Sequence, residues 1–378
     1  NNGSGKINHI DRIVPSLHLL QRIKAAKSAD TLLNIMNEQL NQALEEAQQP
    51  FADTRFNVCR LEIVESDGRQ HLEGTVLDEA TLNAVAEHLR HRVPEARWES
   101  GRVRVLHQAA PHRRVVVTNL TGWQREPSWL GEQQSQGLNG TVVEILEEGE
   151  RWSFGRLEDG YLGYVYNGYL GPAGEAVEPT HITAYPVTLL WQEVGAGVNP
   201  LIGRIFAGTR VAATERPDGW ADIHLAGGLC GHAAPGELRP LVADMPVEAR
   251  RAQLINDAMP YIGVPYLWGG TSAHGIDCSG FAQLMHKLAG VTIPRDADSQ
   301  FDAGLPVDPP YAAGDLLYFG GSGGHRDVSH VGISLGPERD KDGIMMIHSG
   351  RTRNGVYIDD INAVESLRGS FLGGRRFI

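Results

Sequence analysis

Residues from about Pro111 to Leu241 contain no long helical periodicity, and this absence limits how the chain can fold more than any other feature. Short apolar runs recur there between Gly, Asp-Gly and Pro residues, which is the pattern of small β-barrels. The segments before and after this stretch have different patterns. The chain of 378 residues is therefore expected to form several domains, of α+β class overall.

Two similar segments can be aligned within this stretch. Each has a strand introduced by Gly, a turn, a strand that carries Trp and a Gly-rich end. The segments resemble bacterial SH3-like domains of cell-wall proteins, which implies one small barrel over residues 109–177 and another over residues 178–243. We expect Trp152 and Trp220 to fill the barrel cores rather than to contact a ligand. The aligned runs are Leu138–Leu146, Gly149–Trp152 and Asp159–Val165, and then Phe206–Ala213, Asp218–Ile223 and Gly228–His232.

Residues 1–108 combine helical and strand patterns. Apolar residues from about Leu17 to Ala47 have helical spacing and Pro50 ends the run, so residues 1–50 are expected to form two helices. Residues 51–108 are expected to form a small α+β domain with a helix over Ala80–His91. Their order of elements resembles a BON-type domain, a binding and association module. The strand candidates are Arg60–Val64, His71–Val76 and Arg102–Leu106.

Composition and charge exclude some classes of function. The chain has 46 acidic and 34 basic residues and a net charge of -12, which argues against nucleic acid as a partner. No apolar run approaches the ~18–20 residues of a membrane span. Asn1–Lys6 have neither the basic nor the apolar region of a signal peptide and resemble a processed end, so they do not indicate whether the protein is exported.

The three cysteines are too few and too scattered for a disulfide framework or a zinc site. Cys59 and Cys230 are expected to be small core residues, with a bridge between them as the alternative. Cys278 differs from both because a strong helical pattern begins at this residue.

Residues 244–378 have a third pattern, in which helices come first and strands follow. A helix is expected over Ala249–Ala258, and a second begins at Asp277-Cys278 and ends at Gly290. This order indicates an α+β domain rather than alternating βαβ units. The second helix has an apolar face of Phe281, Leu284, Met285 and Leu288, and the strand candidates are Asp315–Phe319, His330–Leu335, Ile344–Ser349 and Val356–Ile361.

Cys278 is the first candidate for chemistry. The partial positive charge of a helix N-terminus favours an anion, so we expect its thiolate to form more easily than that of a free thiol of pKa ~8.5. A nucleophilic thiol needs a base, and His330 and His348 lie on two successive strand candidates. Strand alternation places Gly332 on the face of His330, which leaves space beside the imidazole. His348 shares a face with apolar residues, so a buried core histidine is its alternative role.

Six short motifs follow one another in this domain: Pro265–Gly270, Gly275–Phe281, Ile293–Asp296, Gly314–Leu316, Ser329–Ile333 and Ile347–Gly350. In this order they resemble the motifs of the NlpC-type cell-wall cysteine peptidases, a papain-like family. Together with the SH3-like segments they are similar to the γ-D-glutamyl-L-diamino-acid endopeptidases, which trim murein stem peptides. The resemblance implies a papain-like domain that hydrolyses the bond from γ-D-glutamate to meso-diaminopimelate or lysine without a cofactor.

The resemblance assigns catalytic roles residue by residue. Cys278 is the nucleophile, His330 is the base that later protonates the leaving amine, and His348 orients the imidazole of His330. Tyr266 matches an active-site tyrosine, whose hydroxyl would stabilise the oxyanion together with the backbone N–H of Cys278. A core aromatic is the alternative role for Tyr266.

Substrate-binding roles follow from the same resemblance. Asp277 and Ser279 match the positions that hold the free amino end of the substrate, although both residue types also suit a helix cap. Tyr161 of the first SH3-like domain matches a tyrosine that contributes to the closed end of the cleft. Trp268 is expected to contact the substrate.

The sequence departs from the family pattern in two places. An acidic residue expected near Gln134–Gln136 is absent, with Glu132 as the nearest carboxylate, so a requirement for a free N-terminal L-alanine stays open. The polar stretch Pro337–Gly343 lengthens the connection between His330 and His348, and it is expected to leave the strands intact.

Three other interpretations stay open. A metal site is one, formed by His325, Asp327, His330 and His348. An amidase or acyltransferase on the same scaffold is another, and a non-catalytic wall-binding protein is the third. We favour a peptidoglycan or murein peptide partner, no metal, and a cell-envelope or secreted location over cytoplasmic recycling, while the oligomeric state is not indicated. The remaining histidines, His274, His286 and His325, are expected to be surface groups.

Overall fold

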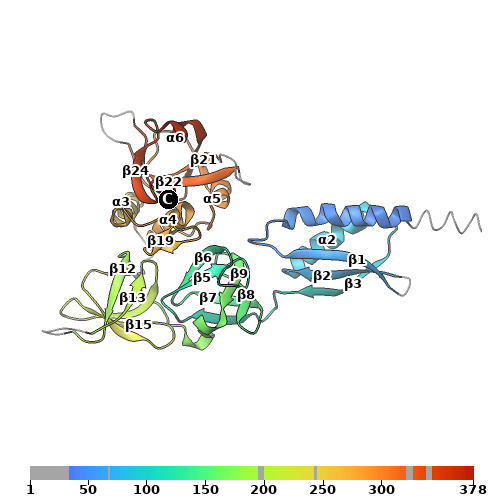
Figure 1. The fold of residues 1–378 in the computed structure, drawn as a ribbon, viewed down its shortest axis with the longest axis horizontal. Coiled ribbons are helices and arrows are strands. Elements are labelled where there is room, and N and C mark those ends of the chain that lie inside the picture. Colours follow the sequence, from blue (N-terminus) through green and yellow to red (C-terminus); the bar gives the residue numbers. More distant parts are fainter. Residues whose placement is uncertain (1–33, 67–68, 195–199, 242–244, 321–326, 338–342) are drawn as a thin grey trace, which may run out of the picture. The chain divides into compact units, whose positions relative to one another are not determined.

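The computed structural model describes residues 34–66, 69–194, 200–241, 245–320, 327–337 and 343–378. The predicted helix before residue 34, His325 and most of the Pro337–Gly343 connection lie outside these ranges. Contacts divide the chain into two compact units, residues 1–108 and residues 109–378, each of which is described by itself (Figure 1).

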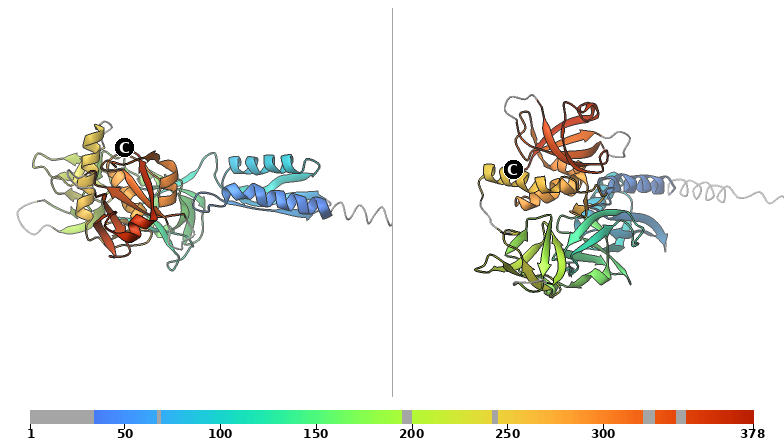
Figure 2. Two further views of the ribbon diagram at one scale, coloured as in Figure 1. Left: turned by 90° about the horizontal axis from the view of Figure 1, so that it is seen from above. Right: turned by 60° about the vertical axis from the view of Figure 1, so that its left-hand side comes forward.

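The described part of the first unit is a three-stranded sheet with two helices packed against it (Figure 2). Strands β1 and β2 form an antiparallel hairpin, and α2 is the crossover that places β3 parallel to β2. The α2 helix begins after Asp78, whose carboxylate accepts a hydrogen bond from the backbone N–H of Thr81. The predicted strands and helix of this region are confirmed, while its likeness to a BON-type domain stays a prediction. The elements are a helix over residues 34–48, β1 Cys59–Ser66, β2 Arg69–Val76, α2 Glu79–Arg92 and β3 Trp98–Val105.

Residues from His112 onward form a first barrel of strand order β10-β4-β7-β8-β9-β5-β6. The fully buried Trp123 fills its core, whereas Trp152 is only partly buried, so the prediction for Trp152 is wrong. Alternation along its strand turns Ser153 and Gly155 inward, and these small residues leave room for the Trp123 indole. The strands are β4 His112–Val116, β5 Leu120–Gln124, β6 Gln133–Leu138, β7 Val142–Glu147, β8 Trp152–Arg156, β9 Leu162–Tyr166 and β10 Leu170–Pro172.

A second barrel follows, with strand order β13-β12-β16-β15-β14-β11-β17. Its core is aliphatic, and Trp220 is only partly buried, so the prediction for this tryptophan is wrong as well. Cys230 is an exposed thiol 3.1 Å from Nδ1 of His224, which corrects its prediction as a core residue, and Cys59 is a partly buried free thiol. The strands are β11 His181–Thr183, β12 Val187–Trp191, β13 Leu201–Phe206, β14 Arg210–Glu215, β15 Ala221–His224, β16 Cys230–Ala233 and β17 Leu238–Pro240.

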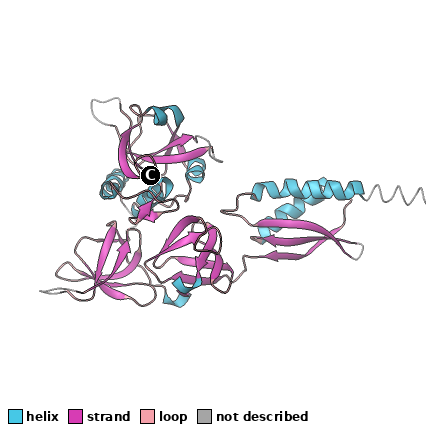
Figure 3. Ribbon diagram, in the orientation of Figure 1, coloured by secondary structure: helices cyan, strands magenta, loops and turns pink. Residues whose placement is uncertain are grey.

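The C-terminal domain packs helices against a six-stranded sheet of order β20-β25-β21-β22-β23-β24, in contrast to the strand-rich barrels (Figure 3). Helix α4 lies against β22 and β23 and is buried along most of its length. The predicted helices and four strands are confirmed. The elements are α3 Val247–Ala258, β18 Thr271–Ser272, β19 Gly275–Ile276, α4 Cys278–Leu288, α5 Ala297–Ala303, β20 Leu305–Val307, β21 Leu316–Gly320, β22 Val328–Ser334, β23 Met345–Gly350, β24 Gly355–Asp360, α6 Glu365–Ser370 and β25 Phe371–Arg376.

Two features of this domain differ from expectation. Strand β25 has two adjacent glycines and no clear alternation, so its place beside β21 had no signal in the sequence. His286 is fully buried, which corrects its prediction as a surface group. The helix is enclosed on the side of His286 as well, because the ring of Phe377 packs edge-on against the imidazole. Within the described residues, no helix has the length and apolar character needed to cross a membrane.

Candidate active site

Cys278 is the first residue of α4 and is buried between this helix and β22. The helix begins here because Asp277 has extended backbone angles and its Oδ1 accepts a hydrogen bond from Gly280 N at 2.6 Å. The backbone N–H of Val331, the residue after His330, is directed toward the sulfur. The fold therefore brings the predicted nucleophile to the strand that carries the predicted base.

The two histidines form a hydrogen-bonded chain that ends at a carboxylate. Nε2 of His330 is 2.7 Å from Nδ1 of His348, and Nε2 of His348 is 3.2 Å from Oδ2 of Asp359. The Asp359 carboxylate only accepts, so His348 donates from Nε2 and accepts at Nδ1 from His330. This tautomer leaves the lone pair on Nδ1 of His330 available for a thiol proton.

Gly332 makes room for this chain, in agreement with the sequence prediction. A Cβ at this position would lie 2.5 Å from the sulfur of Met346 and 3.2 Å from Cβ of His348. Any side chain at Gly332 would therefore displace the thioether of Met346 and require Cβ of His348 to shift by a few tenths of an ångström. Asp359, by contrast, was not predicted, because the apolar run around this carboxylate does not indicate that a histidine lies on the neighbouring strand.

Burial sets the ionisation of the nucleophile and its base. It raises the pKa of the Cys278 thiol to about 12, and the charge of Asp277 adds to that rise. Burial also lowers the pKa of His330 and of His348 below their ordinary values. The N–H groups at the sulfur act in the opposite direction but do not outweigh burial. The thiolate of Cys278 is therefore harder to form than that of a free thiol, which is the reverse of the sequence prediction.

Tyr266 lies close to Cys278, and Trp268 follows it on the same loop. Burial raises the pKa of the Tyr266 phenol to about 12, and the nearby sulfur charge contributes to the rise. The phenol thus keeps a proton that it can donate. Trp268 is 46% exposed, and its indole N–H donates to Oε1 of Glu132 at 2.8 Å. The guanidinium of Arg351 lies over both rings.

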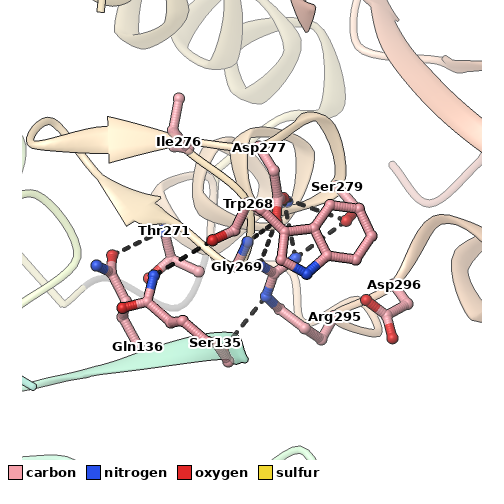
Figure 4. A network of polar contacts seen from close by, with 12 residues as sticks. Ser135, Gln136, Trp268, Gly269, Thr271, Ile276, Asp277, Ser279, Arg295 and Asp296 are labelled. Atoms are coloured by element: carbon pink, nitrogen blue, oxygen red, sulfur yellow. Dashed lines mark hydrogen bonds and ion pairs between the residues drawn. The ribbon is translucent and has the colours of Figure 1, made fainter. Parts of the chain in front are cut away.

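Asp277 and Ser279 belong to a buried network around Arg295 (Figure 4). Arg295 donates to both carboxylate oxygens of Asp277, from Nη2 at 2.6 Å and from Nη1 at 3.0 Å. The same guanidinium donates to Oγ of Ser279 and, from Nε, to Oγ of Ser135. Oδ2 of Asp277 also accepts from Gly269 N at 2.9 Å. Both oxygens of Asp277 are thus engaged by the protein itself.

The first barrel contributes directly to this network. Ser135 and Gln136 come from β6, and Oε1 of Gln136 accepts from Thr271 N at 2.8 Å (Figure 4). The buried hydroxyl of Tyr161 donates to Oδ2 of Asp296 at 3.0 Å. The barrel therefore supplies the polar groups that fix the loops on either side of the α4 N-terminus.

The remaining predicted ligands do not form a metal centre among the residues that the structure describes, where no group of three or more His, Cys, Asp or Glu is placed to hold an ion. His325 lies outside those residues, and His274 is exposed at a loop as expected.

Two family models match the chain. The NlpC/P60 family model matches residues 263–369, and the model of the bacterial dipeptidyl-peptidase Sh3 domain matches residues 125–168. The C-terminal domain is thus an NlpC/P60 domain, of a family of cysteine peptidases, and a bacterial SH3 domain precedes it.

Several curated proteins are similar. The gamma-D-glutamyl-L-lysine dipeptidyl-peptidase of Bacillus cereus (strain ATCC 10987 / NRS 248) is 38% identical over 36% of this chain and 38% of its own length. The protein of the same name from Bacillus subtilis (strain 168) is 43% identical over 26% of this chain and 31% of its own length. These matches span about a third of the two relatives. Dipeptidyl-peptidase 6 of Lysinibacillus sphaericus is 28% identical over 66% of this chain and 91% of its own length.

A solved structure supports the fold. The crystal structure of an NlpC/P60 family protein from Bacillus cereus ATCC 10987 has a TM-score of 0.61 at 23% identity, and the alignment covers 70% of this chain and 99% of that chain. This likeness concerns the fold, so the roles of individual residues must be argued from the site.

Proposed function

We propose that the protein hydrolyses the amide bond between γ-D-glutamate and the following diamino acid, meso-diaminopimelate or lysine, in peptidoglycan stem peptides. The observation that carries the catalytic part is the hydrogen-bonded chain from His330 through His348 to Asp359, next to the sulfur of Cys278. The substrate part rests on the relatives named gamma-D-glutamyl-L-lysine dipeptidyl-peptidase. We place the substrate in the cell wall or in fragments released from it.

The first half-reaction forms a thioester. Nδ1 of His330 takes the proton of Cys278 as the sulfur attacks the γ-carbonyl carbon of glutamate, because neither group is ionised at rest. His348 and Asp359 stabilise the imidazolium that forms. The imidazolium then protonates the amine of the diamino acid, which leaves as the carbon–nitrogen bond breaks.

The second half-reaction hydrolyses the thioester. His330 removes a proton from a water molecule, which attacks the thioester carbon and displaces the sulfur of Cys278. The sulfur then takes this proton back from His330, which restores the neutral thiol and imidazole. In both halves a negative charge develops on the carbonyl oxygen. The N–H of Cys278, at the open end of α4, and the hydroxyl of Tyr266 are the donors that we assign to it.

The first barrel forms one wall of the substrate groove in this proposal. Trp268 contacts the peptide on the acyl side of the bond, whereas the buried Tyr161 and Ser279 act indirectly by fixing Asp296 and Arg295. Asp277 acts as a positioning residue, because the helix cap and Arg295 engage both of its oxygens. A free amino end of the substrate therefore has no unoccupied carboxylate at Asp277.

Mass spectrometry of digested peptides tests the proposal. The wild-type protein should cut L-Ala-γ-D-Glu-meso-diaminopimelate or its lysine counterpart into L-Ala-D-Glu and the diamino acid, and Cys278→Ala should not. Cys230→Ala is the matched control, because this exposed thiol lies in the second barrel and should be dispensable. Full turnover by Cys278→Ala would refute the enzyme assignment, and an uncut peptide would remove the substrate assignment.

A further inference from the structure

Three arginines surround the site, and they differ in their partners. Arg295 is ion-paired with Asp277 and 1% exposed, and Arg353 is ion-paired with Asp359. Arg351 is exposed, and no carboxylate of the described residues lies within ion-pair distance of it. Of these three guanidinium groups, the one at Arg351 is therefore the candidate for a carboxylate supplied from outside the protein.

Arg351 is held in a defined position although it is exposed. Its guanidinium carbon lies 5.6 Å from the ring centre of Tyr266 and 5.2 Å from that of Trp268, and its Nε donates to the Tyr266 hydroxyl at 3.4 Å. The turn that carries it is fixed to the same loop, since Tyr266 N donates to the carbonyl of Asn354 at 3.2 Å. Two aromatic faces thus preorganise the guanidinium, which lowers the entropy lost on binding.

The fork of this guanidinium is available for an anion. Arg351 uses Nε for its hydrogen bond with Tyr266. Among the residues that the structure describes, no partner is found for Nη1 or Nη2 of Arg351. Two parallel N–H groups match the two oxygens of a carboxylate, and a charge-assisted pair of this kind is stronger than a neutral hydrogen bond.

A γ-linked glutamyl residue presents a carboxylate at a suitable separation. Its side-chain carbonyl forms the scissile amide, so its α-carboxylate stays free and lies four bonds, or about 5 Å, from the scissile carbon. Tyr266, which we assign to the oxyanion, contacts Arg351 directly. A substrate whose scissile carbonyl faces Tyr266 can therefore extend its α-carboxylate toward Arg351.

We propose that Arg351 binds the free α-carboxylate of the γ-linked glutamyl residue and so makes the enzyme select this acid over its α-amide. The proposal rests on the proposed function, and it names the feature of the substrate that the site recognises. It makes Arg351 a specificity-determining residue of the acyl side of the groove.

The test compares two tripeptides that differ in one group, L-Ala-γ-D-Glu-L-Lys and its counterpart with the glutamyl α-carboxylate amidated. The wild-type protein should show a kcat/KM about 10- to 100-fold higher for the acid, as expected for a charge-assisted pair. Arg351→Gln should lower kcat/KM for the acid by that factor and leave the amide nearly unchanged. Arg368→Gln, which removes an exposed guanidinium of α6 that donates to the backbone carbonyl of Asn362, should keep the wild-type preference.

Other outcomes would overturn the proposal. A loss in Arg351→Gln of equal size on acid and amide would show that Arg351 only positions Tyr266. A third peptide carries the amide at the lysine carboxylate instead, and the wild-type protein should cut it as fast as the parent peptide. If the wild type preferred the parent over this third peptide, and Arg351→Gln removed that preference, the arginine would belong to the leaving-group side. Equal cleavage of acid and amide by the wild type would also refute it. Failure to cut any of the peptides would instead refute the proposed function.

Discussion

Two polar clusters flank Cys278, and they use the same kinds of group in opposite ways. On the side of the sheet, the proposed catalytic chain His330–His348–Asp359 ends at an arginine, Arg353, whose side chain is 55% exposed. On the side of the first barrel, Asp277 is paired with Arg295, whose side chain is 1% exposed. The first cluster contains groups that can exchange a proton, whereas the second holds a fixed ion pair at the helix cap. Damage to the first should therefore lower catalysis, and damage to the second should lower stability.

The largest effect is expected when the base of the catalytic chain is removed. His330→Ala should lower kcat by about 10³-fold, because general base catalysis and reprotonation of the leaving amine are both lost. The free energy of unfolding should change little, since His330 is only partly buried. Steady-state kinetics and urea unfolding measure the two quantities, with His274→Ala as the exposed control. If His330→Ala retained a tenth of the wild-type kcat, the hydrogen-bonded chain His330–His348–Asp359 would not be the catalytic cluster.

Loss of the Arg295–Asp277 ion pair, on the side of the first barrel, should lower stability more than catalysis. Arg295→Met leaves the Asp277 carboxylate buried without its cation, which should lower the free energy of unfolding by about 3–5 kcal/mol. Arg353→Met is the matched change on the catalytic side. It should cost less than about 1 kcal/mol, because the Arg353 side chain is 55% exposed and Asp359 keeps its hydrogen bond with His348. Urea unfolding of both variants measures the difference. Equal losses would mean that the two clusters do not differ in their structural role.

A smaller effect is expected at the far end of the catalytic chain. Asp359→Asn removes the charge that stabilises the imidazolium form of His330 through His348, yet an amide oxygen can still accept from His348. We expect kcat to fall by about 10-fold, which is only part of the ~10²–10⁴-fold that acid–base catalysis supplies. KM should stay nearly constant, because Asp359 does not touch the substrate in this scheme. A change confined to KM would contradict the role assigned to Asp359.

The sequence was sufficient to predict the parts of the site that depend on local patterns. Asp277 and Cys278 open a helix because a capping residue precedes an apolar helical face, and His330 shares a strand face with Gly332 through simple alternation. Both features lie within a few residues of one another in the chain. The predicted catalytic roles rest on the family resemblance and stay proposals.

The rest of the site depends on which strands and loops meet in space. Asp359 reaches His348 because β24 pairs with β23, and Arg295 reaches Asp277 across 18 positions of the chain. No local pattern contains that information. Burial is equally non-local: the pKa of Cys278 rises although its place at a helix N-terminus predicts the reverse, because packing against β22 removes the sulfur from water.

The smallest expected effect concerns pH, and it distinguishes a neutral resting site from an ion pair. Burial holds the pKa of His330 and of His348 below the ordinary value near 6.5, so both bases are already unprotonated at pH 6. Activity requires the unprotonated base and is lost only as pH falls through these lowered pKa values. We therefore expect kcat/KM to change less than about twofold between pH 6 and pH 8. A base with a pKa of 6.5 would instead make kcat/KM fall about fourfold from pH 8 to pH 6.

Initial rates on a peptide with a free α-carboxylate, measured across this interval, test the expectation. Arg295→Lys is the matched comparison, because it keeps a cation at Asp277 and should leave the flat profile unchanged even where it lowers stability. An acid limb near pH 6.5 in the wild type would mean that His330 is hydrated enough to be charged at rest. A loss of activity above pH 8 would indicate a resting thiolate–imidazolium pair. Either result would remove the contrast between a neutral catalytic chain and a charged structural pair on the two sides of the same sulfur.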